Sequence, residues 1–147
     1  RAAHAGEVPV GAIAVRDGQV VARAANQVES LKDPTAHAEI IVLTQAAAAA
    51  GDWRLSDITV YVTKEPCPMC AGAMVNARVG RLVFGCHDPA GGAAGGAMTI
   101  TDFPGLLHRV DVTSGVLEDA GRELLRLFFK QRRNEARDIA ESAIPAE

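Results

Sequence analysis

Aromatic residues are scarce in this chain of 147 residues, because Phe, Trp and Tyr together make up only 4%. The core must therefore consist mainly of Ala, Val, Ile and Leu. Cysteine is also rare, and three residues are too few for a disulfide scaffold. No apolar run approaches the roughly 20 residues that cross a bilayer, and residues 1–8 lack the apolar stretch of a secretory signal. These absences predict a cytoplasmic protein that makes no use of a membrane.

The overall composition predicts one globular domain, residues 1–147. Hydrophobic residues make up 48% and charged residues 22%, which excludes a disordered or fibrous chain. The formal net charge is −3. Such a charge gives no sign of a nucleic-acid partner, so any such partner has to be inferred from local patches.

The order of the predicted elements indicates an α/β fold. Two strands, 8–15 and 19–28, are predicted to form a hairpin around the turn Asp17-Gly18. Asp33 and Pro34 are typical of an N-cap and a first helical residue, so a helix is expected from there to about Ala50. The remaining elements are predicted strands at 58–63, 81–85 and 110–113, predicted helices at 66–78 and 117–143, and a Gly- and Ala-rich loop at 89–97. The hairpin makes its pair antiparallel, so the sheet should be mixed.

Two short motifs supply residues that bind metals. Cys67 and Cys70 are three positions apart at the start of a predicted helix, where the thiols share one face and the helix N-terminus favours the thiolate. His37 lies near the start of another predicted helix, two residues before Glu39. A catalytic zinc takes three protein ligands and keeps one position open. We therefore predict one zinc ion per chain, bound by His37, Cys67 and Cys70.

Each motif alone has a simpler interpretation. A Cys-x-x-Cys pair can be half of a structural zinc site or a redox pair, and a histidine beside an apolar helix is usually a packing residue. Cys86 is the most tempting fourth ligand, but a single cysteine at a strand end is more often a small hydrophobic residue. The two motifs together are typical of a catalytic site.

The motifs Pro34-Thr35-Ala36-His37-Ala38-Glu39 and Pro66-Cys67-Pro68-Met69-Cys70 resemble those of the zinc-dependent nucleoside and nucleobase deaminases. The closer resemblance is to the bacterial tRNA adenosine deaminases, which convert wobble adenosine to inosine, and it covers nearly the whole chain. It implies a three-layer α/β/α cytidine-deaminase-like fold with a central mixed five-stranded sheet. It also implies a homodimer with no organic cofactor, and a first helix that is shortened in this chain.

The resemblance implies a role for several residues. His37, Cys67 and Cys70 correspond to the zinc ligands, and Glu39 to the group that moves protons while zinc activates a water molecule. Asn26 corresponds to a contact with the target nucleoside. Asp88 corresponds to a contact near the flipped nucleotide, although an Asp-Pro pair also commonly begins a turn.

Basic residues follow one face of the last predicted helix. The stripe consists of Arg122, Arg126, Lys130, Arg133 and Arg137, with Phe129 at its edge, and residues 122–137 carry a local charge of +4. This face predicts binding of a tRNA anticodon stem-loop through Phe129, Lys130 and Arg133. A solvated helix face is the simpler interpretation.

Two other functions stay open. A zinc deaminase of a free nucleobase or nucleoside, such as cytosine, cytidine or guanine, would share the zinc chemistry without needing a basic helix. A non-catalytic RNA-binding zinc protein would have no use for Glu39 beside the metal.

Overall fold

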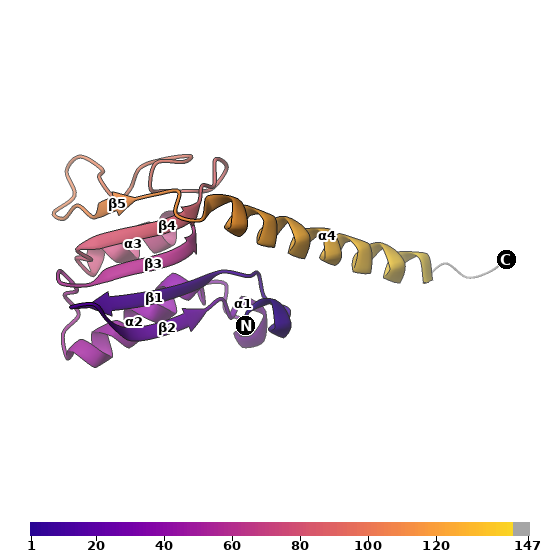
Figure 1. Ribbon diagram of the computed structural model, residues 1–147, viewed down its shortest axis with the longest axis horizontal. Coiled ribbons are helices and arrows are strands. Elements are labelled where there is room, and N and C mark those ends of the chain that lie inside the picture. Colours follow the sequence, from indigo (N-terminus) through magenta and orange to yellow (C-terminus); the bar gives the residue numbers. More distant parts are fainter. Residues whose placement is uncertain (143–147) are drawn as a thin grey trace.

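A mixed five-stranded sheet forms the centre of the computed structural model, which describes residues 1–142 (Figure 1). The strand order is β2-β1-β3-β4-β5, and β1 pairs antiparallel with both β2 and β3. The pairs β3–β4 and β4–β5 are parallel. The strands are β1 (Gly11–Arg16), β2 (Gln19–Ala25), β3 (Thr59–Lys64), β4 (Arg81–Cys86) and β5 (Asp111–Thr113). The predicted mixed five-stranded sheet is confirmed.

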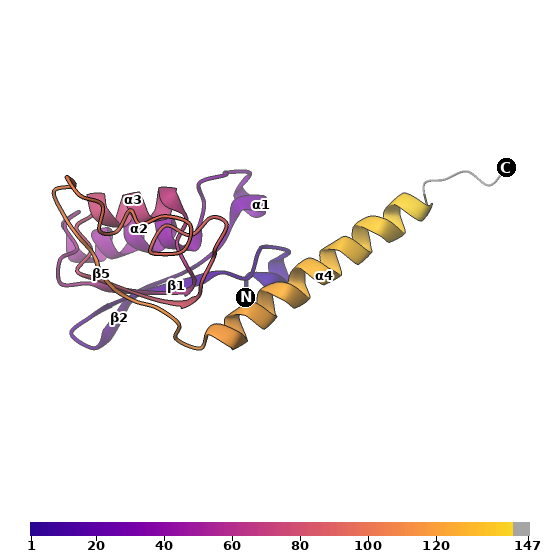
Figure 2. The ribbon, with the colours of Figure 1, turned by 90° about the horizontal axis from the view of Figure 1, so that it is seen from above.

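The hydrophobic core lies between the sheet and two helices. Helices α2 (Ala38–Ala50) and α3 (Pro68–Asn76) lie side by side on one face of the sheet (Figure 2). Side chains alternate between the two faces of a strand, so Ala12 and Ala14 of β1 and Val60 and Val62 of β3 point toward these helices and are buried. Short aliphatic side chains fill this layer, as the scarcity of aromatic residues requires.

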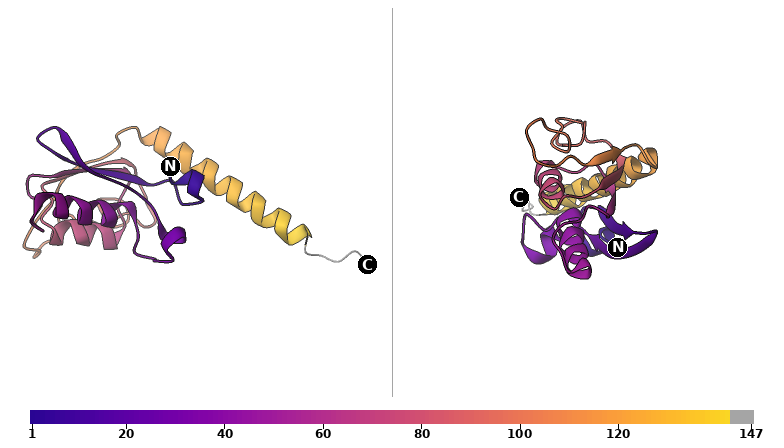
Figure 3. Two further views of the ribbon diagram at one scale, coloured as in Figure 1. Left: turned by 90° about the horizontal axis from the view of Figure 1, so that it is seen from below. Right: turned by 90° about the vertical axis from the view of Figure 1, so that its left-hand side faces the viewer.

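The opposite face of the sheet is covered only in part. Helix α4 (Glu118–Ser142) begins against β4 and then extends beyond the sheet (Figures 2 and 3). Gly121 allows this approach, because a Cβ there would lie 3.2 Å from the Thr63 carbonyl oxygen. A broad apolar depression of about 980 Å³, lined in part by Ile13, Tyr61 and Val83, occupies much of the remaining face. No helix of the described residues is both long and apolar enough to cross a bilayer.

Several element boundaries differ from the predicted ones, and strand β1 begins at Gly11 rather than Val8. Helix α2 begins at Ala38 rather than Pro34, because the Asp33 carboxylate accepts hydrogen bonds from the Thr35 backbone N–H (2.8 Å) and hydroxyl (2.7 Å) and so caps a separate turn. Strand β2 ends at Ala25, and a short helix α1 (Val28–Leu31) follows it. Helix α3 begins at Pro68 with Cys67 as its N-cap. The predicted end of the last helix, residue 143, lies outside the described residues.

Candidate active site

The starts of α2 and α3 bring three metal-binding side chains together. His37 is the N-cap of α2 and Cys67 is the N-cap of α3, while Cys70 lies in the first turn of α3. Their ligand atoms all lie within 4.8 Å of one another. The predicted ligands, 30 and 33 residues apart in the sequence, therefore form one group.

The spacing of these atoms fits a tetrahedral metal centre. The His37 Nδ1 atom lies 3.7 Å from Cys67 Sγ and 3.5 Å from Cys70 Sγ. Tetrahedral zinc with ordinary bond lengths would hold a nitrogen and a sulfur ligand about 3.6 Å apart. One imidazole with two thiolates is also a donor set that zinc prefers. Geometry and chemistry of the three residues thus agree with a zinc site.

The two thiols differ in acidity. The Cys70 side chain donates a hydrogen bond to Cys67, and this bond is the main reason that the pKa of Cys67 falls to about 5. The same pairing, together with burial, raises the pKa of Cys70. One thiolate is therefore available near neutral pH, and a bound cation would favour the second by replacing its proton.

Glu39 lies in the first turn of α2, next to this group and only 4% exposed. Burial raises the pKa of its carboxyl above the ordinary value of 4.5. A raised pKa makes the protonated form of the carboxyl group more accessible than in an ordinary glutamate, so that the group can both accept and donate a proton. This is the behaviour required of a single acid and base.

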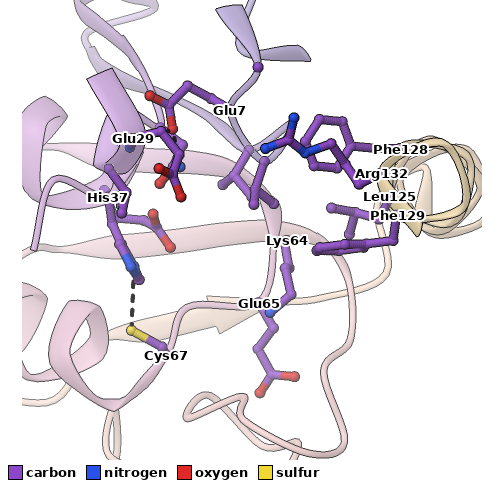
Figure 4. Close-up of a pocket in the computed structure, with 16 residues that line it drawn as sticks. Glu7, Glu29, His37, Lys64, Glu65, Cys67, Leu125, Phe128, Phe129 and Arg132 are labelled. Carbon is purple, nitrogen blue, oxygen red and sulfur yellow. Dashed lines mark hydrogen bonds between the residues drawn. The ribbon is translucent and has the colours of Figure 1, made fainter. Parts of the chain in front are cut away.

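A cavity of about 470 Å³ opens beside these residues (Figure 4). Five of the residues singled out from the sequence line it, namely Asn26, His37, Glu39, Cys67 and Phe129. Its far wall comes from one side of α4, at the helical spacing 125, 128, 129 and 132. Phe128 and Phe129 meet there edge to face, with ring centroids 5.5 Å apart. The cavity therefore joins the metal-binding group to the aromatic part of α4.

Glu7 holds the residues on one wall of the cavity. Its buried carboxylate accepts hydrogen bonds from Asn26 Nδ2 (3.1 Å), the Glu29 N–H (3.1 Å), and the Ser30 N–H and hydroxyl (both 2.7 Å). Asn26 is consequently fixed in orientation, and α1 is fixed beside it. This role could not be read from the sequence, because the partners of Glu7 lie 19–23 positions away.

Glu65 organises the loop that follows β4. One or other of its buried carboxylate oxygens accepts hydrogen bonds from the backbone N–H groups of Asp88 (2.8 Å), Ala94 (3.0 Å) and Gly96 (2.7 Å). Asp88 in turn accepts hydrogen bonds from the N–H groups of Ala90 and Gly91 and forms an ion pair with Lys64. Asp88 therefore does not line the cavity itself, but it pairs with Lys64, which does.

Helix α4 carries more acidic residues than the predicted basic stripe suggested. The helix contains six basic and six acidic residues, so its net charge is zero. Arg122 and Arg126 pair with acidic residues one turn away, and Arg137 lies close to Glu141. Within the described residues no ion pair involves Lys130 or Arg133, and neither lines the cavity. Arg132 does line it, a position that the spacing from Phe129 could have indicated.

Comparisons with known proteins agree with the fold. A model of the MafB19-like deaminases matches residues 1–133. The chain therefore belongs to this deaminase family.

Its relatives within the family include tRNA-specific adenosine deaminases. The protein of that name from Bacillus subtilis is 46% identical over 133 residues, which are 90% of this chain and 83% of the relative. The one from Aquifex aeolicus is 44% identical, over 91% and 88% of the two chains. The resemblance drawn from the motifs is confirmed.

Two solved structures are also similar. One comes from a study of A-to-I editing by tRNA:A34 deaminases at the wobble position of transfer RNA, with a TM-score of 0.78, 44% identity, and coverage of 84% of this chain and 89% of that one. The other is a guanine deaminase from Nitrosomonas europaea, with a TM-score of 0.68, 26% identity, and coverage of 81% and 71%. The predicted deaminase fold is confirmed.

Proposed function

We propose that this protein is an enzyme that deaminates adenosine to inosine at the wobble position of a tRNA anticodon loop. The observation that carries the proposal is the cavity, in which the His-Cys-Cys group and buried Glu39 face the aromatic side of α4. The names of the relatives that are 44–46% identical support the same substrate.

His37, Cys67 and Cys70 would hold one zinc ion per chain. When bound, zinc would supply Lewis-acid activation of a water molecule. The N-cap positions of His37 and Cys67 support this assignment, because both helix starts direct their ligand atoms to one point. Two thiolates and a neutral imidazole balance the charge of the divalent ion.

Glu39 would carry the protons of the reaction. It takes a proton from the attacking water and gives one to N1 of adenine as the water oxygen bonds to C6. It then takes the remaining proton of the new C6 hydroxyl group and delivers it to the amino group, so that the C6–N6 bond breaks, ammonia leaves and the C6 oxygen becomes the carbonyl of inosine. Burial of the carboxyl supports this role, because it brings the pKa closer to the working pH.

The remaining site residues would bind RNA. A base stacked in a loop cannot reach a recessed cavity, so the adenosine must be turned outward, which costs least in a single-stranded loop. Asn26 would contact the inserted nucleoside, Phe129 would stack on a neighbouring base at the cavity mouth, and Asp88 would lie near the flipped nucleotide. Lys130 and Arg133 would contact phosphates further along α4. A homodimer is a further prediction, which rests on the resemblance alone, and a cytoplasmic location is another, which rests on the composition.

Deamination of a free purine is the second candidate, because the guanine deaminase from Nitrosomonas europaea is similar in fold. The two functions differ in what they require of α4. A free base fills only the inner part of the cavity, whereas an RNA loop also needs the cations and aromatic rings around its mouth.

Product analysis separates these functions. The zinc-loaded protein is incubated with total tRNA, and the RNA is then digested and analysed by mass spectrometry for inosine. Parallel reactions with free adenosine, guanine and cytidine are followed by ammonia release, and Glu39→Gln serves as the inactive control. Inosine in tRNA that depends on Glu39 supports the proposal. Ammonia from a free base without inosine in tRNA would contradict it.

A further inference from the structure

The walls of the cavity are richer in acidic than in basic groups. Four carboxylates and two permanent cations are among the lining residues, namely Glu7, Glu29, Glu39 and Glu65 against Lys64 and Arg132. An RNA chain carries a negative charge at every phosphate, so it must meet cations at such an entrance. The loop 88–97, which borders the site, contains no basic residue. Lys64 and Arg132 are therefore the two cations that the cavity itself offers.

Lys64 occupies a fixed position between the catalytic group and α4. It is the last residue of β3, three positions before Cys67, and its side chain extends between the His37–Cys67 pair and Phe129 (Figure 4). Its ammonium group pairs with Asp88, whose carboxylate is itself held by the N–H groups of Ala90 (3.1 Å) and Gly91 (3.0 Å). The lysine side chain therefore loses little further freedom when it binds an anion.

Asp88 does not exhaust the donors of Lys64. An ammonium group has three N–H donors, and among the described residues Lys64 pairs with one carboxylate oxygen, Asp88 Oδ2. The Lys64 side chain is 29% exposed, so water reaches it from the cavity. Glu65, the adjacent carboxylate, accepts hydrogen bonds from backbone N–H groups of the loop that follows β4. Donors of Lys64 thus stay available to a ligand.

We propose that Lys64 binds a phosphate of the RNA backbone next to the extruded adenosine, with Asp88 holding its ammonium group in place. The inference rests on the proposed function, because a free base or nucleoside carries no phosphate, whereas the RNA chain places one beside the extruded adenosine. Arg132 lies on the α4 side of the same mouth, where it is 3.6 Å from Glu135. Lys64, at the end of β3, is the cation held in place, and Arg132, on α4, is the more exposed one.

Four variants separate a phosphate contact from simple neutralisation of Asp88. They are Lys64→Met, Lys64→Arg, Asp88→Asn and the double variant Lys64→Met/Asp88→Asn. The matched control is Arg109→Met, which also removes a cation paired with an aspartate (Asp102, 3.1 Å) but at the other end of the sheet. Partly exposed ion pairs contribute little to stability, so all five proteins should fold, which circular dichroism checks.

Equilibrium binding of a fluorescent anticodon stem-loop RNA is measured by anisotropy between about 50 and 200 mM salt. Lys64→Met should weaken binding roughly three- to tenfold near 100 mM salt and make the log–log salt slope shallower by about one unit. Lys64→Arg should retain the parent slope. The double variant should have a shallower salt slope than Asp88→Asn, because only the double variant lacks Lys64. Arg109→Met should bind RNA with the affinity and salt slope of the parent.

Two outcomes overturn the inference. Parent-like affinity and slope in Lys64→Met mean that no phosphate contacts this lysine. Recovery of both in the double variant means that Lys64 only neutralises Asp88. Inosine formation by the parent is measured separately, so a parent that binds RNA but makes no inosine contradicts the proposed function, while the salt slopes still decide the contact.

Discussion

Glu39 can be tested separately from the metal, because it lies beside the ligand group without belonging to it. Glu39→Gln preserves the size of the side chain but removes its ability to accept a proton. We expect the rate of inosine formation to fall by about 10²- to 10⁴-fold, the range for losing a positioned acid or base. Zinc content, measured by mass spectrometry, should stay at one ion per chain. Activity within a few-fold of the parent would assign the proton transfers to another group.

Glu7 links stability to pH. Burial raises the pKa of its carboxyl, but the hydrogen bonds from Ser30, Glu29 and Asn26 together outweigh burial and hold the pKa below its ordinary value of 4.5. The folded state therefore binds a proton less readily than the unfolded state. The resulting stabilisation is fully present above the unfolded pKa and is lost as the pH falls through the folded pKa.

Glu7→Gln should lower the free energy of unfolding by about 1–3 kcal/mol at pH 7, because an amide N–H replaces one of the acceptors. Urea unfolding at pH 7 and at several pH values below 4.5 tests both effects. The parent should lose more stability with acid than the variant does. Equal slopes against pH would show that Glu7 is not the group responsible.

At the scale of elements, the loop 88–97 depends on glycine at the points where it meets Glu65. A Cβ at Gly96 would collide with the Glu65 carboxylate and lie 2.6 Å from the Asp88 carbonyl oxygen. Gly96→Ala should therefore destabilise the protein by about 1–3 kcal/mol, the usual cost of overpacking. The matched control is Gly72→Ala in α3, where a Cβ meets nothing within 4 Å and should stabilise by about 0.5–1 kcal/mol. Melting temperatures that move in the same direction in both variants would contradict this account.

Helix α4 divides its cations between internal ion pairs and free positions. Lys130→Gln/Arg133→Gln removes the two that form no ion pair within the described residues. Arg122→Gln/Arg137→Gln removes two that lie beside acidic residues of the helix. If the free cations contact phosphates, the first variant should show a salt slope for RNA binding that is shallower by about two units. The second should change it much less. Similar slopes in both variants would mean that this face is only solvated.

For the whole molecule, the sequence predicted the type of sheet and the grouping of the metal-binding residues better than it predicted where the helices begin and end. The alternation of apolar residues, the Asp17-Gly18 turn and the two metal-binding motifs were sufficient for the mixed sheet and for the grouping of His37, Cys67 and Cys70. The predicted start of α2 was wrong, because Asp33 is a good capping residue for a turn as well as for a helix. The contacts made by Glu7, Glu65 and Lys64 could not be read from the sequence, because their partners lie 19–31 positions away.

The proposed zinc site would also tie two distant parts of the chain together, since its ligands belong to α2 and α3. A ligand bound only by the folded state stabilises it in proportion to its occupancy. Removing zinc with a chelator should therefore lower the melting temperature, by roughly 5–10 °C if the free ion is about 100-fold above its dissociation constant.

Cys67→Ala/Cys70→Ala should contain no stoichiometric zinc, melt near the chelated parent and show no response to chelator. Cys86→Ala is the control, because Cys86 contacts the Thr63 carbonyl oxygen and lies outside the ligand group. It should keep one zinc ion and the full response to chelator, whereas zinc retained by the double variant would contradict the assigned ligands.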